Sequence, residues 1–296
     1  MDCTPSELAQ INQKSLVTLP DGRKVPRLGQ GTWHLAQDPQ NRKNEIETLR
    51  TGIRLGMTLL DTAEMYGEGA SERLVGEAIQ GIPRDNLFLV SKVYPQNAGR
   101  DSIFKSCEKS IRRLGGTYLD LYLLHWRGSI PLAETVTCME ELKKQGMIRG
   151  WGVSNFDIGD MQELWETPGG KHCQVNQVLY HLASRGIEYS LLPWMEKQNL
   201  PLMAYCPLAQ GGSLRSGLLE NPAVKAVASA HRVSPIQIVL SFALRSSKAI
   251  AIPMTRSVRH VRENAEANLI HLTPEDLQTL SGSYPPPRRK LPLDMQ

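Results

Sequence analysis

The sequence predicts an α/β protein folded as a (β/α)8 TIM barrel, with an N-terminal β-hairpin and extra helices near the C-terminus. From Leu28 onward, short apolar runs alternate with amphipathic segments that carry charges on one face, the pattern of βα units around a parallel sheet. The chain has 296 residues, and a barrel of this kind needs about 250. The sequence has no long linker or low-complexity stretch, so we expect one domain over residues 1–296.

The first predicted element is a β-hairpin around an Asp-Gly turn. Residues 15–19 and 24–26 resemble short strands, and Asp21-Gly22 lies between them. Ahead of the first barrel strand, such a hairpin could cover the bottom opening of a barrel.

Eight barrel strands follow in the prediction, each as a short apolar run. They cover residues 28–32, 58–61, 87–92, 119–125, 148–154, 173–177, 201–205 and 249–252. The helices predicted between them include residues 44–55, 101–114, 131–145 and 158–165, with another beginning near Ser71. Gly56, Gly115 and Gly146 stand where helices should stop, because glycine readily adopts the left-handed conformation that ends many helices.

The C-terminal part is predicted to add helices to the barrel. Segments 222–231 and 235–245 have helical patterns and precede the last strand. Thr273-Pro274-Glu275-Asp276 has the residue types of a helix start. The tail with Pro285-Pro286-Pro287 cannot form regular structure, and it could lie over the barrel mouth.

The composition is that of an ordinary globular protein, with 41% hydrophobic and 22% charged residues. The net charge of +4 is spread along the chain, which argues against nucleic acid and permits a phosphate-bearing ligand. We expect a cytoplasmic protein without a membrane segment, because no signal peptide and no apolar run of about 20 residues is present. The five cysteines show no CxxC spacing and are expected to be free thiols. A monomer is the default expectation.

The ends of the predicted strands carry side chains suited to recognition or chemistry. At seven of the eight ends the residue is polar or aromatic: Trp33, Asp61, Lys92, His125, Ser154-Asn155, Gln177 and Tyr205, whereas the eighth strand ends at Pro253-Met254. In barrels of this class the chemistry takes place at the C-terminal ends of the strands. Asp61 at a strand end, with Tyr66 on the following loop, could place a general acid in a pocket. An apolar core alone gives no reason for this pattern.

The motifs around these residues resemble those of the aldo-keto reductase superfamily, including its bacterial branch of methylglyoxal reductases. The shared motifs are Gly31-Thr32-Trp33, Asp61-Thr62-Ala63-Glu64-Met65-Tyr66-Gly67, Leu119-Asp120-Leu121-Tyr122-Leu123-Leu124-His125-Trp126, Gly152-Val153-Ser154-Asn155-Phe156 and Val175-Asn176-Gln177. The resemblance covers residues 28–276, nearly the whole chain, with the motifs in the expected order.

The resemblance implies a catalytic tetrad of Asp61, Tyr66, Lys92 and His125. Tyr66 would supply the proton for reduction of a carbonyl by a nicotinamide. Because a free tyrosine has a pKa of about 10, Lys92 is expected to lower that pKa and Asp61 to hold Lys92 in place. His125 would hydrogen-bond the substrate oxygen. Taken alone, Lys92 and Asp61 could equally be a structural ion pair.

The resemblance also implies an NADPH site. The residues assigned to it are Thr32, Trp33, Asp61, Ser154, Asn155, Gln177, Tyr205, Pro207, Leu208, Gln210, Ile252, Pro253, Met254, Thr255, Arg256, His260, Glu263 and Asn264. Ser154, Asn155 and Gln177 would hold the nicotinamide carboxamide, and Tyr205 would stack on the ring. Ser154 and Asn155 could instead cap the following helix. The loop over residues 206–210 would follow the pyrophosphate.

At the adenosine end the sequence departs from the family pattern. Met254 stands at the position of a lysine that grips the 2′-phosphate in many relatives, and His260 at that of an arginine. Thr255 and Arg256 could still bind the phosphate. Glu263 and Asn264 match positions that contact adenine.

The substrate pocket is expected to be framed by Trp33, Tyr66, His125 and Trp126. Aromatic walls favour small aldehydes and ketoaldehydes, such as methylglyoxal and aromatic aldehydes. The serious alternative is a regulatory module that binds the cofactor with little turnover, as in potassium-channel β subunits. A Rossmann dehydrogenase is disfavoured because Gly29-Gln30-Gly31 lacks a third glycine. A metal-dependent hydrolase is disfavoured because no HxH or HExxH pair occurs.

Overall fold

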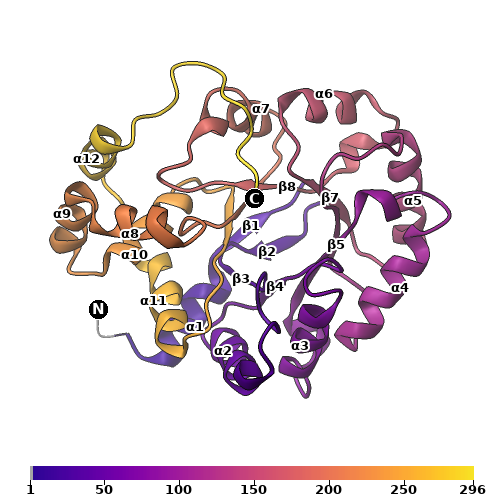
Figure 1. The fold of residues 1–296 in the computed structure, drawn as a ribbon, viewed down its shortest axis with the longest axis horizontal. Coiled ribbons are helices and arrows are strands. Elements are labelled where there is room, and N and C mark those ends of the chain that lie inside the picture. The colour runs from indigo at the N-terminus through magenta and orange to yellow at the C-terminus, as the bar shows by residue number, and fades with distance from the viewer. Residues whose placement is uncertain (1–2) are drawn as a thin grey trace.

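The computed structural model of the protein describes residues 3–296 and contains an eight-stranded parallel β-barrel (Figure 1). Neighbouring strands pair in chain order from β3 to β10. Their bounds are β3 (Gly29–Gly31), β4 (Leu59–Asp61), β5 (Phe88–Val93), β6 (Leu121–Leu124), β7 (Trp151–Ser154), β8 (Asn176–Leu179), β9 (Leu202–Tyr205) and β10 (Ala249–Ile252). The predicted (β/α)8 barrel is confirmed.

The barrel closes where β3 meets β10. The Gly31 N–H donates to the Pro253 carbonyl at 3.0 Å, and the Ala251 N–H donates to the Arg27 carbonyl at 2.8 Å. Gly31 is required at this seam, because a Cβ atom there would lie 2.7 Å from the Ile252 carbonyl oxygen.

Alternate side chains of each strand fill the barrel interior. The inward set forms one buried apolar cluster, which contains Leu59, Phe88, Val90, Leu121, Leu123, Val175, Met203, Ile250 and Ile252. The outward set packs in a second cluster with the helices, for example Leu60, Leu89, Tyr122 and Leu124. This period of two decides which residues beyond each strand face the barrel axis.

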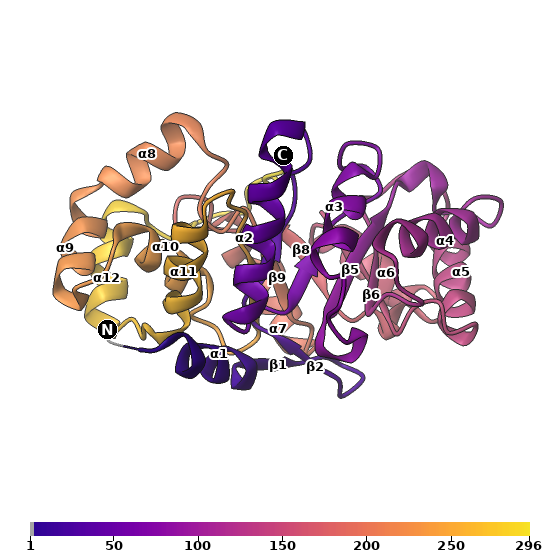
Figure 2. The same ribbon diagram turned by 90° about the horizontal axis from the view of Figure 1, so that it is seen from below.

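The bottom of the barrel is covered by the predicted hairpin. Strands β1 (Leu16–Thr18) and β2 (Lys24–Pro26) pair antiparallel. Val17 and Val25 are buried in the same cluster as the inward-facing barrel residues. Figure 2 shows α1, β1 and β2 together below the barrel, at the end opposite to the C-terminus.

Twelve α-helices are described, most of them around the barrel. They are α1 (Pro5–Lys14), α2 (Arg42–Arg54), α3 (Ala70–Ala78), α4 (Ile103–Leu114), α5 (Leu132–Lys144), α6 (Ile158–Glu166), α7 (Leu191–Lys197), α8 (Gly212–Glu220), α9 (Pro222–His231), α10 (Pro235–Ala243), α11 (Val258–Glu266) and α12 (Pro274–Ser283). Six short 3₁₀ turns are η1 (Pro39–Asn41), η2 (Arg84–Asn86), η3 (Pro95–Asn97), η4 (Gly170–His172), η5 (Gly186–Glu188) and η6 (Ala267–Leu269). Among the residues described, none of the helices has the length and apolar character needed to cross a membrane.

The prediction missed α1, α7 and α8. Helix α7 has only seven residues and contains Pro193, and α8 contains Gly212 and Gly217. Proline and glycine are the poorest helix formers, so local sequence gives a weak signal there. The helices α9 and α12, which the sequence did predict, begin with proline after an Asn or Thr cap. Helix α1 has the same start, with Pro5 after the Thr4 cap, so its signal was present in the sequence and the prediction did not use it.

The C-terminal tail runs from α12 to the barrel mouth, where it was predicted to lie (Figure 1). The Ser184 Oγ donates to Asp294 Oδ2 at 2.5 Å, and Lys290 Nζ lies 2.5 Å from Asp157 Oδ2. Gln296 lines a cavity in the mouth. The tail therefore forms part of the wall above the strand ends.

Candidate active site

The four residues of the predicted tetrad meet at the C-terminal end of the barrel. Asp61 ends β4, Lys92 lies near the end of β5, His125 follows β6, and Tyr66 stands on the loop before α3. Asp61, Lys92 and His125 lie two residues beyond the inward-facing Leu59, Val90 and Leu123, so each continues the inward series of its strand. The polar site is the top layer of the barrel interior.

Lys92 is the centre of this group. Its Nζ donates to Asp61 Oδ1 at 2.6 Å, to the Thr62 carbonyl at 2.9 Å and to Tyr66 Oη at 3.2 Å. These contacts use all three of its N–H groups. The side chain of Lys92 is fully buried, and that of Asp61 is 3% exposed.

Burial disfavours the charged forms of Asp61 and Lys92, and the attraction between the two charges favours them. Burial lowers the pKa of Lys92 and raises the pKa of Asp61, and in each case the opposite charge of the partner counteracts the shift. Gln177 Nε2 also donates to Asp61 Oδ2 at 2.8 Å, which favours the charged carboxylate. The contacts are those of a buried and hydrogen-bonded ion pair.

The expectation that Lys92 lowers the pKa of Tyr66 below its usual value is wrong for this structure. Burial, followed by the charge of Asp61, raises the pKa of Tyr66 well above its ordinary value. The physical reason is that Asp61 neutralises the cation beside a phenol that is already buried. Tyr66 therefore keeps its phenol proton, and its Oη at the same time accepts a hydrogen bond from Lys92 Nζ.

His125 is a neutral imidazole beside Tyr66. The two rings meet edge to face with centroids 5.8 Å apart. Burial and the nearby charge of Lys92 lower the pKa of His125 to about 2. Among residues 3–296, the buried Nδ1 atom of His125 has no hydrogen-bond partner. Because Nδ1 is closed to solvent, contact with a ligand in the mouth falls to the rest of the ring, which lines the second cavity described below.

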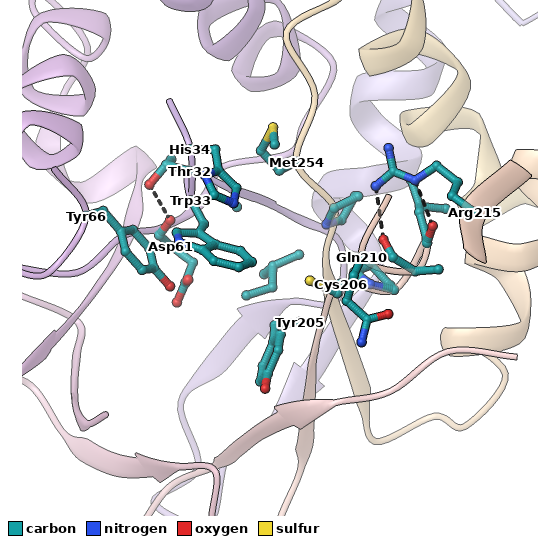
Figure 3. A pocket seen from close by; sticks show the side chains of 16 residues that line it. Thr32, Trp33, His34, Asp61, Tyr66, Tyr205, Cys206, Gln210, Arg215 and Met254 are labelled. Atoms are coloured by element: carbon teal, nitrogen blue, oxygen red, sulfur yellow. Dashed lines mark hydrogen bonds between the residues drawn. The ribbon is translucent and has the colours of Figure 1, made fainter. Parts of the chain in front are cut away.

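Two adjoining cavities open above these residues. The first spans about 580 Å³, including space open to solvent, and is lined by Gly31, Thr32, Trp33, His34, Asp61, Tyr66, Tyr205, Cys206, Pro207, Leu208, Ala209, Gln210, Arg215, Ile252, Pro253 and Met254 (Figure 3). The second spans about 350 Å³ on the same measure and is lined by Trp33, Met65, Tyr66, His125, Ser154, Asn155, Gln177, Tyr205 and Gln296. Trp33, Tyr66 and Tyr205 border both cavities, so the tetrad lies where the two meet.

The residues predicted for the nicotinamide form one hydrogen-bond network. Tyr205 Oη donates to Asn155 Oδ1 at 2.8 Å, Asn155 Nδ2 donates to the His125 carbonyl at 3.2 Å, and Ser154 Oγ donates to the Gln177 carbonyl at 2.8 Å. The alternative that Ser154 and Asn155 cap α6 is wrong, because Asp157 makes that cap.

Gln177 was predicted to end its strand, and the structure places it within the strand. Strand β8 continues to Leu179, so Gln177 lies inside the strand instead of at its end. Its amide nitrogen is bound to Asp61. The side chain thus joins the tetrad network as well as lining the second cavity.

The adenosine-end residues are spread over the start of α11. Ser257, with its side chain accepting from the His260 N–H, makes the N-cap. Arg256 donates to Glu45 Oε1 at 2.9 Å and to the His34 carbonyl. Met254 lines the first cavity, and Asn264 is buried. Thr255 and Glu263 are placed by local contacts, Thr255 accepting from Ser257 N–H and Glu263 lying 3.9 Å from Arg259.

The sequence reasoning missed Arg215, on α8. Its Nε donates to the Leu208 carbonyl and its Nη2 to the Ala209 carbonyl, each at 3.0 Å (Figure 3). Of the residues that line the first cavity, Arg215 is the only lysine or arginine. The weak helix signal of α8 hid it, since Gly212 and Gly217 leave no helical pattern on which to place an arginine.

Three of the four residues predicted for the substrate pocket, Trp33, Tyr66 and His125, line the second cavity, whereas Trp126 is not among the residues that line either cavity. Trp126 lies behind them in contact with His125, with ring centroids 4.8 Å apart, and Tyr94 meets Trp126 edge to face at 5.9 Å. Trp33 stacks on His34 with ring centroids 4.0 Å apart. Tyr94 is a further residue that the sequence reasoning did not single out.

Comparisons with known proteins agree with this geometry. The family model described as Aldo/keto reductase family matches residues 27–284. The chain is 51% identical to methylglyoxal reductase YeaE of Escherichia coli (strain K12) over 283 residues, which are 96% of this chain and 99% of the relative. It is 32% identical to a glyoxal reductase of Bacillus subtilis (strain 168), covering 91% of this chain and 92% of the relative.

A solved structure is similar over the same length. It is an aldo/keto reductase from Klebsiella pneumoniae in complex with NADP and acetate, 51% identical, with a TM-score of 0.92. The match covers 96% of this chain and all of that chain. The strand order, the tetrad at the strand ends and these matches lead to one conclusion: the chain belongs to the aldo/keto reductase family.

Proposed function

We propose that this protein reduces small aldehydes and ketoaldehydes to alcohols with NADPH, and that Tyr66 donates the proton. The observation that carries the proposal is the contact of Lys92 Nζ with Tyr66 Oη, 3.2 Å long, at the junction of the two cavities. This contact leaves the phenol proton available to a substrate oxygen.

The first cavity suits a dinucleotide. It combines an aromatic side chain, Tyr205, with the loop over residues 206–210 and one arginine, Arg215. Tyr205 suits a flat ring, and Arg215 suits a phosphate because its guanidinium keeps N–H groups beyond the two that it uses. When bound, NADPH supplies the hydride. The Klebsiella relative in complex with NADP supports this choice.

The tetrad residues divide the proton chemistry between them. Tyr66 is protonated in the neutral range and gives its proton to the substrate oxygen. Lys92 stabilises the phenolate that remains, and Asp61 and Gln177 hold Lys92 in place. His125, being neutral, can donate a hydrogen bond to the same oxygen without competing as an acid. Positioned proton transfer of this kind contributes about 10²–10⁴ in rate.

The second cavity suits a small uncharged carbonyl compound. It spans about 350 Å³ including space open to solvent, and the side chains that line it carry no formal charge, since His125 is neutral. Trp33 and Tyr66 give it aromatic walls. The reductases of methylglyoxal and glyoxal among the relatives support methylglyoxal, and the aromatic walls support aromatic aldehydes.

A substrate panel tests the proposal. Consumption of NADPH would be followed at 340 nm with methylglyoxal, benzaldehyde and a sugar acid such as glucuronate. We expect turnover of the first two and little of the third, because no lysine or arginine lines the second cavity. Tight binding of NADPH without turnover of any small aldehyde would contradict the proposal and favour a regulatory binding module.

A further inference from the structure

A buried carboxylate joins the two loops that border the first cavity. Glu45 lies on α2, and its side chain is 0% exposed. Its Oε2 accepts from the Ala36 N–H at 2.8 Å, and its Oε1 accepts from Arg256 Nε at 2.9 Å. Ala36 belongs to the loop after β3 and Arg256 to the loop after β10, more than 200 residues apart in the chain.

Two further hydrogen bonds complete the connection. Arg256 Nη2 donates to the His34 carbonyl, and Asn44 Nδ2 donates to the Arg256 carbonyl at 2.6 Å. His34 and Ala36 have φ of 67° and 62°, in the left-handed region that non-glycine residues seldom adopt. Such a backbone persists only where surrounding contacts hold it. Here both residues are held by the Glu45–Arg256 pair.

The same loop carries part of the cavity wall. Trp33 and His34 line the first cavity, and their rings stack at 4.0 Å with an interplanar angle of 29°. Met254, two residues before Arg256, lines the cavity from the β10 side (Figure 3). The pair therefore joins two neighbouring parts of one cavity wall through the backbone.

We infer that Glu45 and Arg256 are positioning residues that hold the loop with Trp33 and His34 against the loop with Met254, an ion pair called the clasp below. We also infer that Arg256 is not the 2′-phosphate anchor. The inference rests on the proposed function in taking NADPH as the ligand of this cavity. Arg256, like Arg215, uses its Nε and one Nη on the protein, but only Arg256 has its charge matched by a carboxylate, that of the fully buried Glu45. A neutral pair attracts an extra phosphate far less than a free guanidinium would.

The two roles of Arg256 differ in their effect on cofactor choice. A clasp shapes the part of the site that NADPH and NADH share, so its loss weakens both. An anchor acts on the 2′-phosphate, which only NADPH has, so its loss weakens NADPH alone. Removing Glu45 distinguishes the two roles further. If Arg256 were the anchor, loss of its carboxylate partner would leave NADPH binding unchanged or stronger; if the pair is a clasp, the same change weakens both cofactors.

The experiment measures the dissociation constants of NADPH and NADH by isothermal titration calorimetry. The proteins are the wild type, Glu45→Gln, Arg256→Gln and the double variant. We expect each single variant to weaken both cofactors by a similar factor, about tenfold, and the double variant to add little, because contacting partners are strongly non-additive. The ratio of the two constants should stay within about twofold of the wild type, and kcat should change less than the KM for NADPH.

Two further variants guard the result. Glu77→Gln breaks the Arg42–Glu77 pair between α2 and α3, whose Arg42 Nε to Glu77 Oε2 distance is 3.0 Å, away from both cavities. Because this pair is partly exposed, its loss should change stability by less than about 1 kcal/mol and should change neither dissociation constant, so any general effect of losing an ion pair on α2 would be recognised. Asn44→Ala removes one exposed clasp contact and serves if Glu45→Gln does not fold; it should weaken both cofactors alike.

The outcomes that overturn the inference are specific. A loss of NADPH affinity confined to Arg256→Gln, with NADH unchanged and with Glu45→Gln unchanged or tighter for NADPH, would make Arg256 the anchor. Unchanged constants in Arg256→Gln and Asn44→Ala would show that the clasp positions nothing. A wild type that binds neither cofactor would instead refute the proposed function, and the inference with it.

Discussion

Removing the charge of Asp61 should destabilise the protein strongly, because Lys92 would stay buried without a partner. In Asp61→Asn the Lys92 ammonium, which is 0% exposed, keeps only neutral acceptors. Breaking a buried ion pair in this way costs about 3–5 kcal/mol of unfolding free energy. The double variant Asp61→Asn with Lys92→Met removes both charges, and such replacements are often neutral or stabilising. We expect it to recover most of the stability and none of the activity.

Urea denaturation of the wild type, both single variants and the double variant measures these free energies. Glu108→Gln is the control, since the Arg112–Glu108 pair is an exposed pair on α4 and should leave the midpoint unchanged. A loss below about 1 kcal/mol in Asp61→Asn would mean that the pair behaves like a surface pair and would refute the reasoning. A double variant as unstable as the sum of the two singles would refute it as well.

Four further predictions concern single groups. His125 stays neutral because its pKa is lowered to about 2, so the pH profile of kcat/KM should show no inflection near pH 6.5 in the wild type. An inflection there that disappears in His125→Gln would contradict the neutral imidazole. Glu188, bound by Arg185, has a lowered pKa, so its stabilisation is present above about pH 4.5 and fades as pH falls; the stabilities of the wild type and Glu188→Gln should converge in acid, and a constant gap would contradict this. Cys206 is a half-buried thiol on the wall of the first cavity, and burial raises its pKa to about 11. Iodoacetamide should therefore label it slowly at pH 7.5, as followed by mass spectrometry, and rapid labelling would contradict the raised pKa. Arg215→Gln should weaken NADPH and NADH alike in calorimetry, because both have a pyrophosphate; a selective loss of NADPH would place Arg215 at the 2′-phosphate instead.

The strand-end positions of Asp61, Lys92 and His125 were predictable from the sequence, whereas their assignment with Tyr66 as a tetrad came from the motifs shared with the aldo-keto reductases. Leu59 and Asp61, Val90 and Lys92 are pairs of inward neighbours, so the apolar residue of each pair already indicates the direction of the polar one. The hairpin was predictable for a similar reason, since Asp21-Gly22 fixes the turn locally. These features depend on residues close in sequence.

Other features depend on residues far apart in sequence or on burial. The contact of Arg256 with Glu45 joins segments 211 positions apart, and no local pattern marks it. Arg215 was hidden because α8 has poor helix formers. The direction of the Tyr66 pKa was mispredicted because the sequence suggested a cation nearby but not the depth of burial that outweighs it.

The most direct test of the account compares NADPH consumption with methylglyoxal by the wild type and by Tyr66→Phe, together with NADPH binding by both. Because Tyr66 supplies the proton, we predict turnover in the wild type, a loss of at least about 10²-fold in kcat for the variant, and similar NADPH binding in the two proteins. Equal rates in both would contradict the assignment of Tyr66 as the proton donor.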